Sequence, residues 1–337
     1  MKKFLVISII SFLVIACSRQ DLTFTTFPEI MAIPPGYPDI QAPADNVYTL
    51  ARWTLGKRLF HDPIMSSDKS ISCASCHNQV NAFSDHVSLS EGVHKRLNTL
   101  NTPTLTNIAY NPYFTSAGGV STLEKHVLVP VQEHNEFDFN MLLIVERIKD
   151  DPTYVELSKQ SYDRLPDAYV ITRAIACYER SLLSFESEFD KYNMGKTDAM
   201  GVSAKRGMDL FYSDKTQCSS CHSGINFTDY SFKNNGLYKD YQEEGRLKLT
   251  GNEEDRGLFK VPTLRNIERT APYMHDGSMA DLNSVIRHYE SGGLPHKNRS
   301  EHIRPFSLTG DERKDLIQFL KSLTDENFVS NPIFNNK

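Results

Sequence analysis

The chain has 337 residues, which corresponds to about two domains of ordinary size. Hydrophobic residues make up 39% and charged residues 23%, so each half has enough apolar side chains for a core. A formal net charge of −5 does not fit the basic surface that binds nucleic acid, and no nucleic-acid partner is expected.

Residues 1–17 are expected to be a lipoprotein signal peptide. Lysines precede a short apolar stretch, which ends with Val-Ile-Ala before Cys17 and resembles a bacterial lipobox with Cys17 as the lipidated residue. An ordinary cleaved signal with an incidental cysteine is the alternative. Ser18 after the cysteine indicates sorting to the outer membrane. The mature protein is therefore expected on the periplasmic side of the cell envelope, held at the membrane by a lipid anchor.

The next segment, residues 18–45, is rich in proline and is expected to be an extended tether. Beyond it, apolar residues recur three to four positions apart, as in amphipathic helices. The expected helices cover residues 50–60, 141–148, 168–189, 204–211, 282–289 and 311–323. Few segments alternate with a period of two, so the fold is expected to be mostly α with minor β structure.

The chain contains an internal repeat. Pro-Thr-Leu-Thr-Asn at 103–107 returns as Pro-Thr-Leu-Arg-Asn at 262–266, and each string follows a pair of closely spaced cysteines. The two halves therefore look like copies of one plan. We expect an N-terminal domain at 46–195 and a C-terminal domain at 196–337.

Both cysteine pairs carry the pattern C-x-x-C-H, which attaches c-type haem. The residues are Cys73, Cys76 and His77 in the first half, and Cys218, Cys221 and His222 in the second. The spacing places both thiols on one side of a helical turn, where they can bond to the vinyl groups, and projects the imidazole onto the iron. A zinc site or redox disulfides are the alternatives, but neither explains a histidine after both pairs. We expect two covalently bound haem c groups, one in each of two tandem cytochrome c-type domains with long loops.

The second axial ligand of each iron decides the function. A six-coordinate haem passes electrons, whereas an open position can bind peroxide. The candidate ligands are His86, His94, His126, His134, Met274, His275, Met279, His288 and Tyr289. The residues alone do not choose among them.

Several longer strings are more specific. They include Leu-Phe-His-Asp-Pro at 59–63, Phe-Lys-Val-Pro-Thr-Leu-Arg-Asn at 259–266 and Ala-Pro-Tyr-Met-His-Asp-Gly at 271–277. With these strings the chain resembles the bacterial di-haem cytochrome c peroxidase family, which includes the MauG-type enzymes, from about Asn46 to Leu323. The resemblance implies that the haem at His77 reacts with peroxide. The haem at His222 would receive electrons from a small cytochrome or cupredoxin.

The resemblance also identifies Tyr289 as the distal ligand of the second haem. The ligand in this family lies fourteen residues after the histidine of the Tyr-x-His-Asp-Gly string, which is His275 here. The peroxidase branch has methionine at this position and the MauG branch has tyrosine. The alternative is that Tyr289 is a core aromatic residue, with Met274 and Met279 as fallback ligands.

At the first haem, the resemblance implies that Glu136 is the acid–base catalyst of peroxide cleavage. His126 stands where the family has glutamine, and we expect it to assist the same proton transfer; ligation of the iron is the alternative. His94 lies one residue from the position of a displaceable distal histidine in members that need reductive activation. We expect an open iron site rather than ligation by His94.

The family also holds a calcium ion. The matching positions are Asn101, through its side chain, and Thr270 and Pro272, through their backbone carbonyls, and such oxygen ligands suit calcium. One position departs from the pattern, because Ser116 replaces the tryptophan that usually lies between the haems. Electron transfer would then follow another route, for which Tyr113 is a candidate.

The expected function is reduction of hydrogen peroxide by a di-haem c-type peroxidase. The first alternative is a MauG-like oxidase that modifies a partner protein, and the second is a di-haem electron carrier without enzymatic activity. Members of the family are often homodimers, so a homodimer is a further expectation.

Overall fold

The computed structural model describes residues 31–335, and the chain from Ile33 onward forms one compact unit. The expected signal peptide, its lipidated Cys17 and residues 18–30 of the expected tether lie outside the described residues. Within residues 31–335, no helix is long and apolar enough to cross a membrane.

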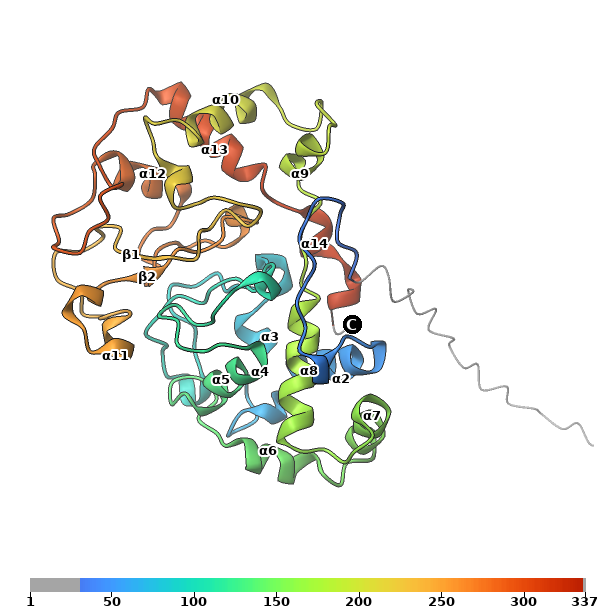
Figure 1. Ribbon diagram of the computed structural model, residues 1–337. Helices are drawn as coiled ribbons and strands as arrows, with labels where there is room; N and C mark the ends of the chain where they lie inside the picture. The colour runs from blue at the N-terminus through green and yellow to red at the C-terminus, as the bar shows by residue number, and fades with distance from the viewer. Residues whose placement is uncertain (1–30, 336–337) are drawn as a thin grey trace, which may run out of the picture. The chain divides into compact units, whose positions relative to one another are not determined.

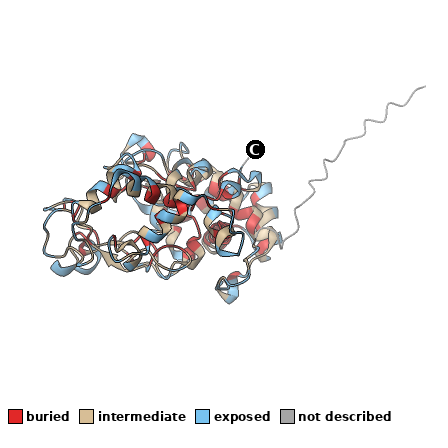
Figure 2. Ribbon diagram, turned by 90° about the horizontal axis from the view of Figure 1, so that it is seen from above, coloured by how far each residue is buried: buried red, intermediate tan, exposed pale blue. Residues whose placement is uncertain are grey.

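The fold is mostly helical, as the periodicity predicts (Figure 1). The helices are α2 (Leu50–His61), α3 (Cys73–Cys76), α4 (Leu123–His126), α5 (Leu128–Gln132), α6 (Met141–Ile148), α7 (Pro152–Tyr162), α8 (Ala168–Arg180), α9 (Glu188–Asn193), α10 (Val202–Phe211), α11 (Leu247–Thr250), α12 (Leu282–Glu290), α13 (Gly310–Lys321) and α14 (Glu326–Ser330). Two short strands, β1 (Phe232–Lys233) and β2 (Phe259–Lys260), pair antiparallel. Buried residues lie both on the helices and in the loops between them, and the helices also carry exposed residues on their outer sides (Figure 2).

The helix expected at 168–189 is shorter than its periodicity predicts. It ends at Arg180, and a separate helix, α9, begins at Glu188. Between them the backbone bonds elsewhere, because the Ser184 N–H donates to the Asn107 side-chain oxygen at 2.7 Å. Ser187 then starts α9 with a capping box, in which it and Asp190 satisfy each other's backbone N–H groups.

Each half contains one close helix crossing, and both crossings depend on glycine. In the first half, α2 lies against α8 at Gly56, where a Cβ would overlap the Ala174 carbonyl and reach within 2.9 Å of the Tyr178 Cβ. In the second half, α10 lies against α13 at Gly207, where a Cβ would overlap the Asp315 carbonyl. Helix axes can approach this closely only where a side chain is missing.

The repeated Pro-Thr-Leu strings also end in the same geometry. Asn107 and Asn266 both have left-handed backbone angles, with φ of 54° and 58°, which asparagine tolerates better than most residues. The Asn107 N–H donates to the Leu182 carbonyl at 2.8 Å, and the Asn266 N–H donates to the Leu323 carbonyl at 3.0 Å. The Asn107 side-chain oxygen accepts the Ser184 N–H at 2.7 Å, and the Asn266 side-chain oxygen accepts the Asp325 N–H at 2.8 Å. In each case the donor lies two residues after the leucine. The halves therefore share a backbone plan as well as a sequence plan.

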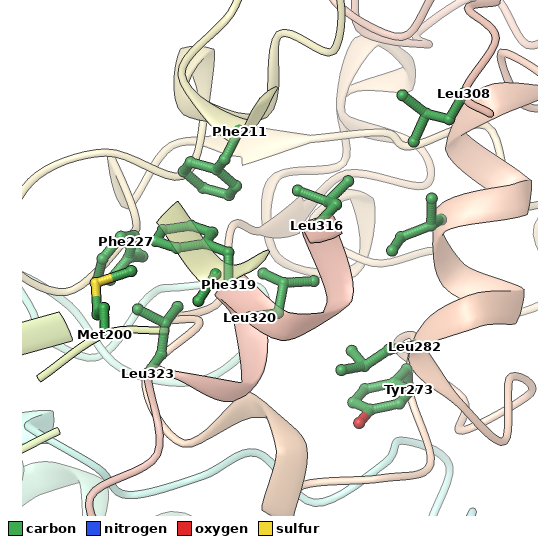
Figure 3. Close-up of a cluster of buried hydrophobic side chains, with 12 residues drawn as sticks. Met200, Phe211, Phe227, Tyr273, Leu282, Leu308, Leu316, Phe319, Leu320 and Leu323 are labelled. Carbon is green, nitrogen blue, oxygen red and sulfur yellow. The ribbon is translucent and has the colours of Figure 1, made fainter. Parts of the chain in front are cut away.

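The core of the second half forms around α10 and α13. Figure 3 shows Phe211 from α10 beside Phe319 from α13, with Phe227 from the loop after the second cysteine pair. All three rings are at most 1% exposed, and Cys218 packs against the same cluster. The second cysteine pair therefore lies next to a buried aromatic cluster.

The described part of the expected tether packs against the folded body. The Tyr37 hydroxyl donates to the Asp190 carboxylate at 2.8 Å, and its ring lies 4.5 Å from the ring of Phe185. Tyr110 donates to the Pro38 carbonyl at 2.9 Å. Residues from Tyr37 onward are thus attached to the body.

The end of the chain covers the first half. The rings of Phe328 and Phe334 lie 5.4 and 6.0 Å from that of Phe83. The Gln79 side-chain amide donates to the carbonyls of Phe328 and Asn331, at 3.0 and 2.7 Å. Both contacts fall within a few residues of His77, so the last helix helps to build the first attachment site.

Candidate functional site: two repeated haem-attachment motifs

The first attachment site (Cys73, Cys76 and His77) is built on the short helix α3. The His77 N–H donates to the Cys73 carbonyl at 2.9 Å, so the histidine follows directly from the helical turn. The His77 ring nitrogen Nδ1 lies 2.8 Å from the Phe83 carbonyl oxygen. A carbonyl only accepts hydrogen bonds, so Nδ1 carries the proton and Nε2 keeps its lone pair for a metal.

The second attachment site (Cys218, Cys221 and His222) repeats this arrangement. His222 Nδ1 lies 3.0 Å from the carbonyl oxygen of Phe227, which leaves its Nε2 free in the same way. Burial lowers the pKa of both histidines, so both rings are neutral and ready to ligate.

These geometries fit covalently bound haem. Within residues 31–335, none of the four motif cysteines forms a disulfide, and no three metal-binding side chains lie together in a cluster. Each site instead offers two thiols and one oriented imidazole, which is the donor set of c-type haem.

Glu136 lies beside the first attachment site. Burial raises its carboxyl pKa, although Asn98 donates a hydrogen bond to Oε1 at 3.0 Å. Burial is the main cause that raises the thiol pKa of Cys73 and of Cys76, and the charge of Glu136 adds a smaller increase to both. The expected acid–base residue is therefore within electrostatic range of both attachment thiols.

His126 ends α4 near the same site. Its ring stacks on that of Phe114 at 5.6 Å, and its pKa is lowered to about 4, mainly by burial and also by the charges of His77 and Lys260. The ring is therefore neutral at pH 7. A neutral imidazole can accept a proton, as the assisting role requires.

His94 lies at the surface. Its side chain is 58% exposed and lies 3.7 Å from the Asp68 carboxylate. The residue before it, Val93, is buried and donates its N–H to the Glu136 carbonyl at 2.9 Å. In this arrangement the loop presents a valine, and not a histidine, beside Glu136.

Tyr289 faces the second attachment site from α12. Its pKa is raised to about 12, mainly by burial and with a smaller increase from the charges of Cys218 and Cys221, while a hydrogen bond with Asn235 lowers it. Of the two fallback ligands, Met274 accepts a hydrogen bond from Asn235 at 3.2 Å.

Met279, the other fallback ligand, packs against the apolar cluster of Figure 3. The charges of both motif cysteines act on Tyr289, so the tyrosine lies within electrostatic range of the second attachment site.

The positions expected to bind calcium are partly brought together. The Asn101 N–H donates to the His275 carbonyl at 2.8 Å, which places it beside the loop that contains Thr270 and Pro272. The Asn101 side-chain amide donates to the Val87 and Ser88 carbonyls, both at 3.1 Å, which leaves its oxygen for another partner.

The halves meet at Tyr113, which precedes the phenylalanine that stacks on His126. Its hydroxyl donates to the Tyr230 carbonyl, and its ring stacks on Phe232 at 5.1 Å and 18°. Asp229, which directly precedes Tyr230, donates its N–H to the Cys221 carbonyl at 2.8 Å. Contacts through Tyr113 thus link the loop after Cys221 to Phe114 and His126, without a tryptophan.

Two residues near the first site were missed by the sequence reasoning. Lys260 comes from the second half, donates to the Tyr113 carbonyl at 3.3 Å and has a pKa lowered by burial to about 8. Glu179 on α8 is buried, and its charge also raises the pKa of the Cys73 thiol. Lys260 stands in the string at 259–266 that carries the family resemblance, and Glu179 lies in the helix expected at 168–189. Neither pattern predicts where the side chain points.

Comparison with known proteins gives one consistent result. The family model described as di-haem cytochrome c peroxidase matches residues 50–198. The "Methylamine utilization protein MauG" of Methylorubrum extorquens is 36% identical over 84% of this chain and 81% of its own length. The "Cytochrome c551 peroxidase" of Nitrosomonas europaea is 33% identical over 81% of this chain and 79% of its own length. A solved structure, that of "a MauG-like protein associated with microbial copper homeostasis", superposes with a TM-score of 0.86 at 31% identity, covering 90% of this chain and 97% of that one. With two oriented histidines, two cysteine pairs and these relatives, the chain belongs to the di-haem cytochrome c peroxidase family and is an oxidoreductase with covalently bound haem c.

Proposed function

We propose that this protein reduces hydrogen peroxide at the N-terminal haem, with electrons that arrive through the C-terminal haem. The observation that carries the proposal is that two buried groups act on the first attachment site: Glu136, whose pKa is raised by burial, and the neutral His126. At the second site, the buried titratable residue that interacts with the motif cysteines is Tyr289.

Glu136 performs the proton transfer. Peroxide reduction consumes two electrons and two protons and yields two molecules of water, so a group must move a proton from the near oxygen to the leaving oxygen. Bound haem would supply the redox centre for the electrons. The Glu136 carboxylate accepts the first proton and returns it, and its raised pKa brings it closer to neutrality, where both transfers are efficient. His126 accepts a hydrogen bond or a second proton nearby.

Electrons enter on the side of His222. We propose a small cytochrome or cupredoxin as the donor, and the contacts through Tyr113 as the route between the halves. Tyr289 as distal ligand would favour ferric iron, because a phenolate stabilises the higher charge. Calcium at Asn101, Thr270 and Pro272 would hold the loop that contains His275, and this part of the proposal rests on the family resemblance.

The proposed cellular location, domain bounds and oligomeric state rest on the sequence. A signal peptide with Cys17 as lipid anchor would place it on the periplasmic side of the envelope, at the outer membrane, with residues 46–195 and 196–337 as its two haem domains. A homodimer is part of the same proposal.

A second candidate function is favoured by Tyr289 alone. A MauG-like oxidase would withdraw electrons from residues of a partner protein and not from a small donor, and a relative with the printed name MauG is 36% identical. The absence of a tryptophan at Ser116 weakens this candidate, because its long-range route would need Tyr113.

The test is the reaction of the fully oxidised holoprotein with stoichiometric peroxide, followed by haem absorbance in a stopped-flow instrument. An immediate change in the wild type and a slow one in Glu136→Gln support the proposal, with the exposed Glu133→Gln as matched control. A change only after one-electron reduction would show that a ligand such as His94 must first leave. No reaction in either state would contradict the peroxidase proposal and leave an electron carrier.

A further inference from the structure

Glu179 is a buried carboxyl that none of the roles above uses. It lies in the last turn of α8 and is 6% exposed. Its Oε2 atom makes no hydrogen bond to any residue in the described part of the chain. An ionised carboxylate here would lose its hydration without replacement, so the neutral acid is the stable form unless positive charge arrives nearby.

The neighbouring charges do not supply that compensation. Arg180 is engaged by Glu124, at 2.7 Å through one terminal nitrogen and 2.9 Å through the other. On α2, Lys57 donates to the Ile333 carbonyl at 2.6 Å, and His61 bonds to the Lys57 carbonyl at 2.9 Å.

The pKa of Glu179 follows from these neighbours. Burial raises it to about 8; Arg180 lowers it and the like charge of Glu124 raises it. The carboxyl is therefore mostly protonated at neutral pH, and a modest change of local charge can ionise it.

Glu179 also acts on the first attachment site. Among the charges that raise the pKa of the Cys73 thiol, that of Glu179 has the largest effect. Cys73 is the point at which the haem would be bonded to the chain, and charges interact strongly in a buried environment. A negative charge on Glu179 would therefore stabilise the oxidised form of the centre held there, and a neutral Glu179 would stabilise the reduced form.

We propose that Glu179 is a redox-linked proton-binding residue of the first haem site. Glu179 binds a proton as an electron arrives at this site and releases it as the electron leaves, so charge in the interior stays balanced. The inference rests on the proposed function only in requiring haem at Cys73. Because peroxide reduction consumes protons, Glu179 would supply one close to the place where it is used. Glu179 acts through its charge on the haem environment and is not assigned a contact with the substrate.

The test measures the midpoint potential of each haem in the full-length holoprotein by spectroelectrochemical titration between about pH 6 and pH 9. In the wild type, the potential of one haem is expected to fall as the pH rises. Full coupling of one proton to one electron changes the equilibrium constant tenfold per pH unit, which is about 59 mV. Glu179→Gln, which keeps the volume of the side chain, is expected to flatten this slope for the same haem. Glu156→Gln on the exposed face of α7 is the matched control and keeps the wild-type slope.

Two results would overturn the inference: a wild-type protein without a slope, or a Glu179→Gln variant that keeps it. Should this variant lose haem, an infrared difference spectrum of the wild type decides instead. A protonated carboxyl band must appear on reduction and shift in deuterated water, and its absence refutes the inference. Peroxide turnover of the same samples separates the two proposals. A protein that reduces peroxide without a pH slope refutes only the role of Glu179, and one with the slope but no turnover refutes only the peroxidase function.

Discussion

Replacement of Gly207 by alanine tests the close crossing of α10 and α13. In an open helix, glycine to alanine stabilises by about 1 kcal/mol, because alanine has the higher helix propensity. Here the added Cβ would overlap the Asp315 carbonyl and approach the Phe319 Cβ to 2.9 Å, so the two helices must separate. Overpacking of this kind costs about 1–3 kcal/mol and at times more. Phe211 and Phe319 would also lose contact as the helices part.

We therefore expect Gly207→Ala to destabilise the protein by about 2 kcal/mol, which for a unit of this size corresponds to a fall in Tm of about 3 °C. Gly310→Ala is the matched control, since nothing lies within 4 Å of a Cβ at that position at the start of α13. The control should be neutral or slightly stabilising. Thermal and urea unfolding of both holoproteins, followed by circular dichroism, give the comparison. A Gly207→Ala variant as stable as the wild type would show that the helices do not approach so closely in solution.

The remaining predictions concern the two sites. Glu136→Gln should slow the reaction with peroxide by about 10²–10⁴-fold, the usual contribution of acid–base catalysis, and stopped-flow absorbance measures it; an unchanged rate would exclude the role. Tyr289→Met should raise the midpoint potential of the second haem and alter its spectrum, and an unaltered spectrum would show that Tyr289 does not ligate. His126 has a folded pKa lowered to about 4, below its unfolded value near 6.5. The unfolded state therefore binds the proton first, and stability falls as the pH falls from about 6.5 to 4, by up to about 3 kcal/mol; His126→Gln should remove that fall in urea titrations.

The sequence predicts those parts of the site in which chemistry fixes the spacing. C-x-x-C-H leaves little freedom, since both thiols and the imidazole must reach one macrocycle. The expectation that Tyr289 is a ligand rests on the family resemblance and stays a prediction; the residue itself lies on α12, where the periodicity predicts a helix.

Tertiary contacts decide what the sequence could not show. The periodicity of residues 168–189 continues past Arg180, but Asn107 takes the Ser184 N–H and ends the helix. Lys260 reaches the first site from the other half of the chain, and no local pattern reports such a contact. Tyr37 belongs to a proline-rich segment with the composition of a tether, yet a single phenol bonded to a buried carboxylate fixes it to the body.

The packing of α14 on Phe83 has a consequence for how the protein is made. Phe83 supplies the carbonyl that orients His77, but Phe328 and Phe334, which cover it, are the last aromatic residues of the chain. A contact between such distant parts of a sequence forms late, because the intervening loop must close first. During folding, the first cysteine pair would therefore stay uncovered until the last helix packs on Phe83. The carbonyl that orients His77 would then be fixed in one of the last steps of folding.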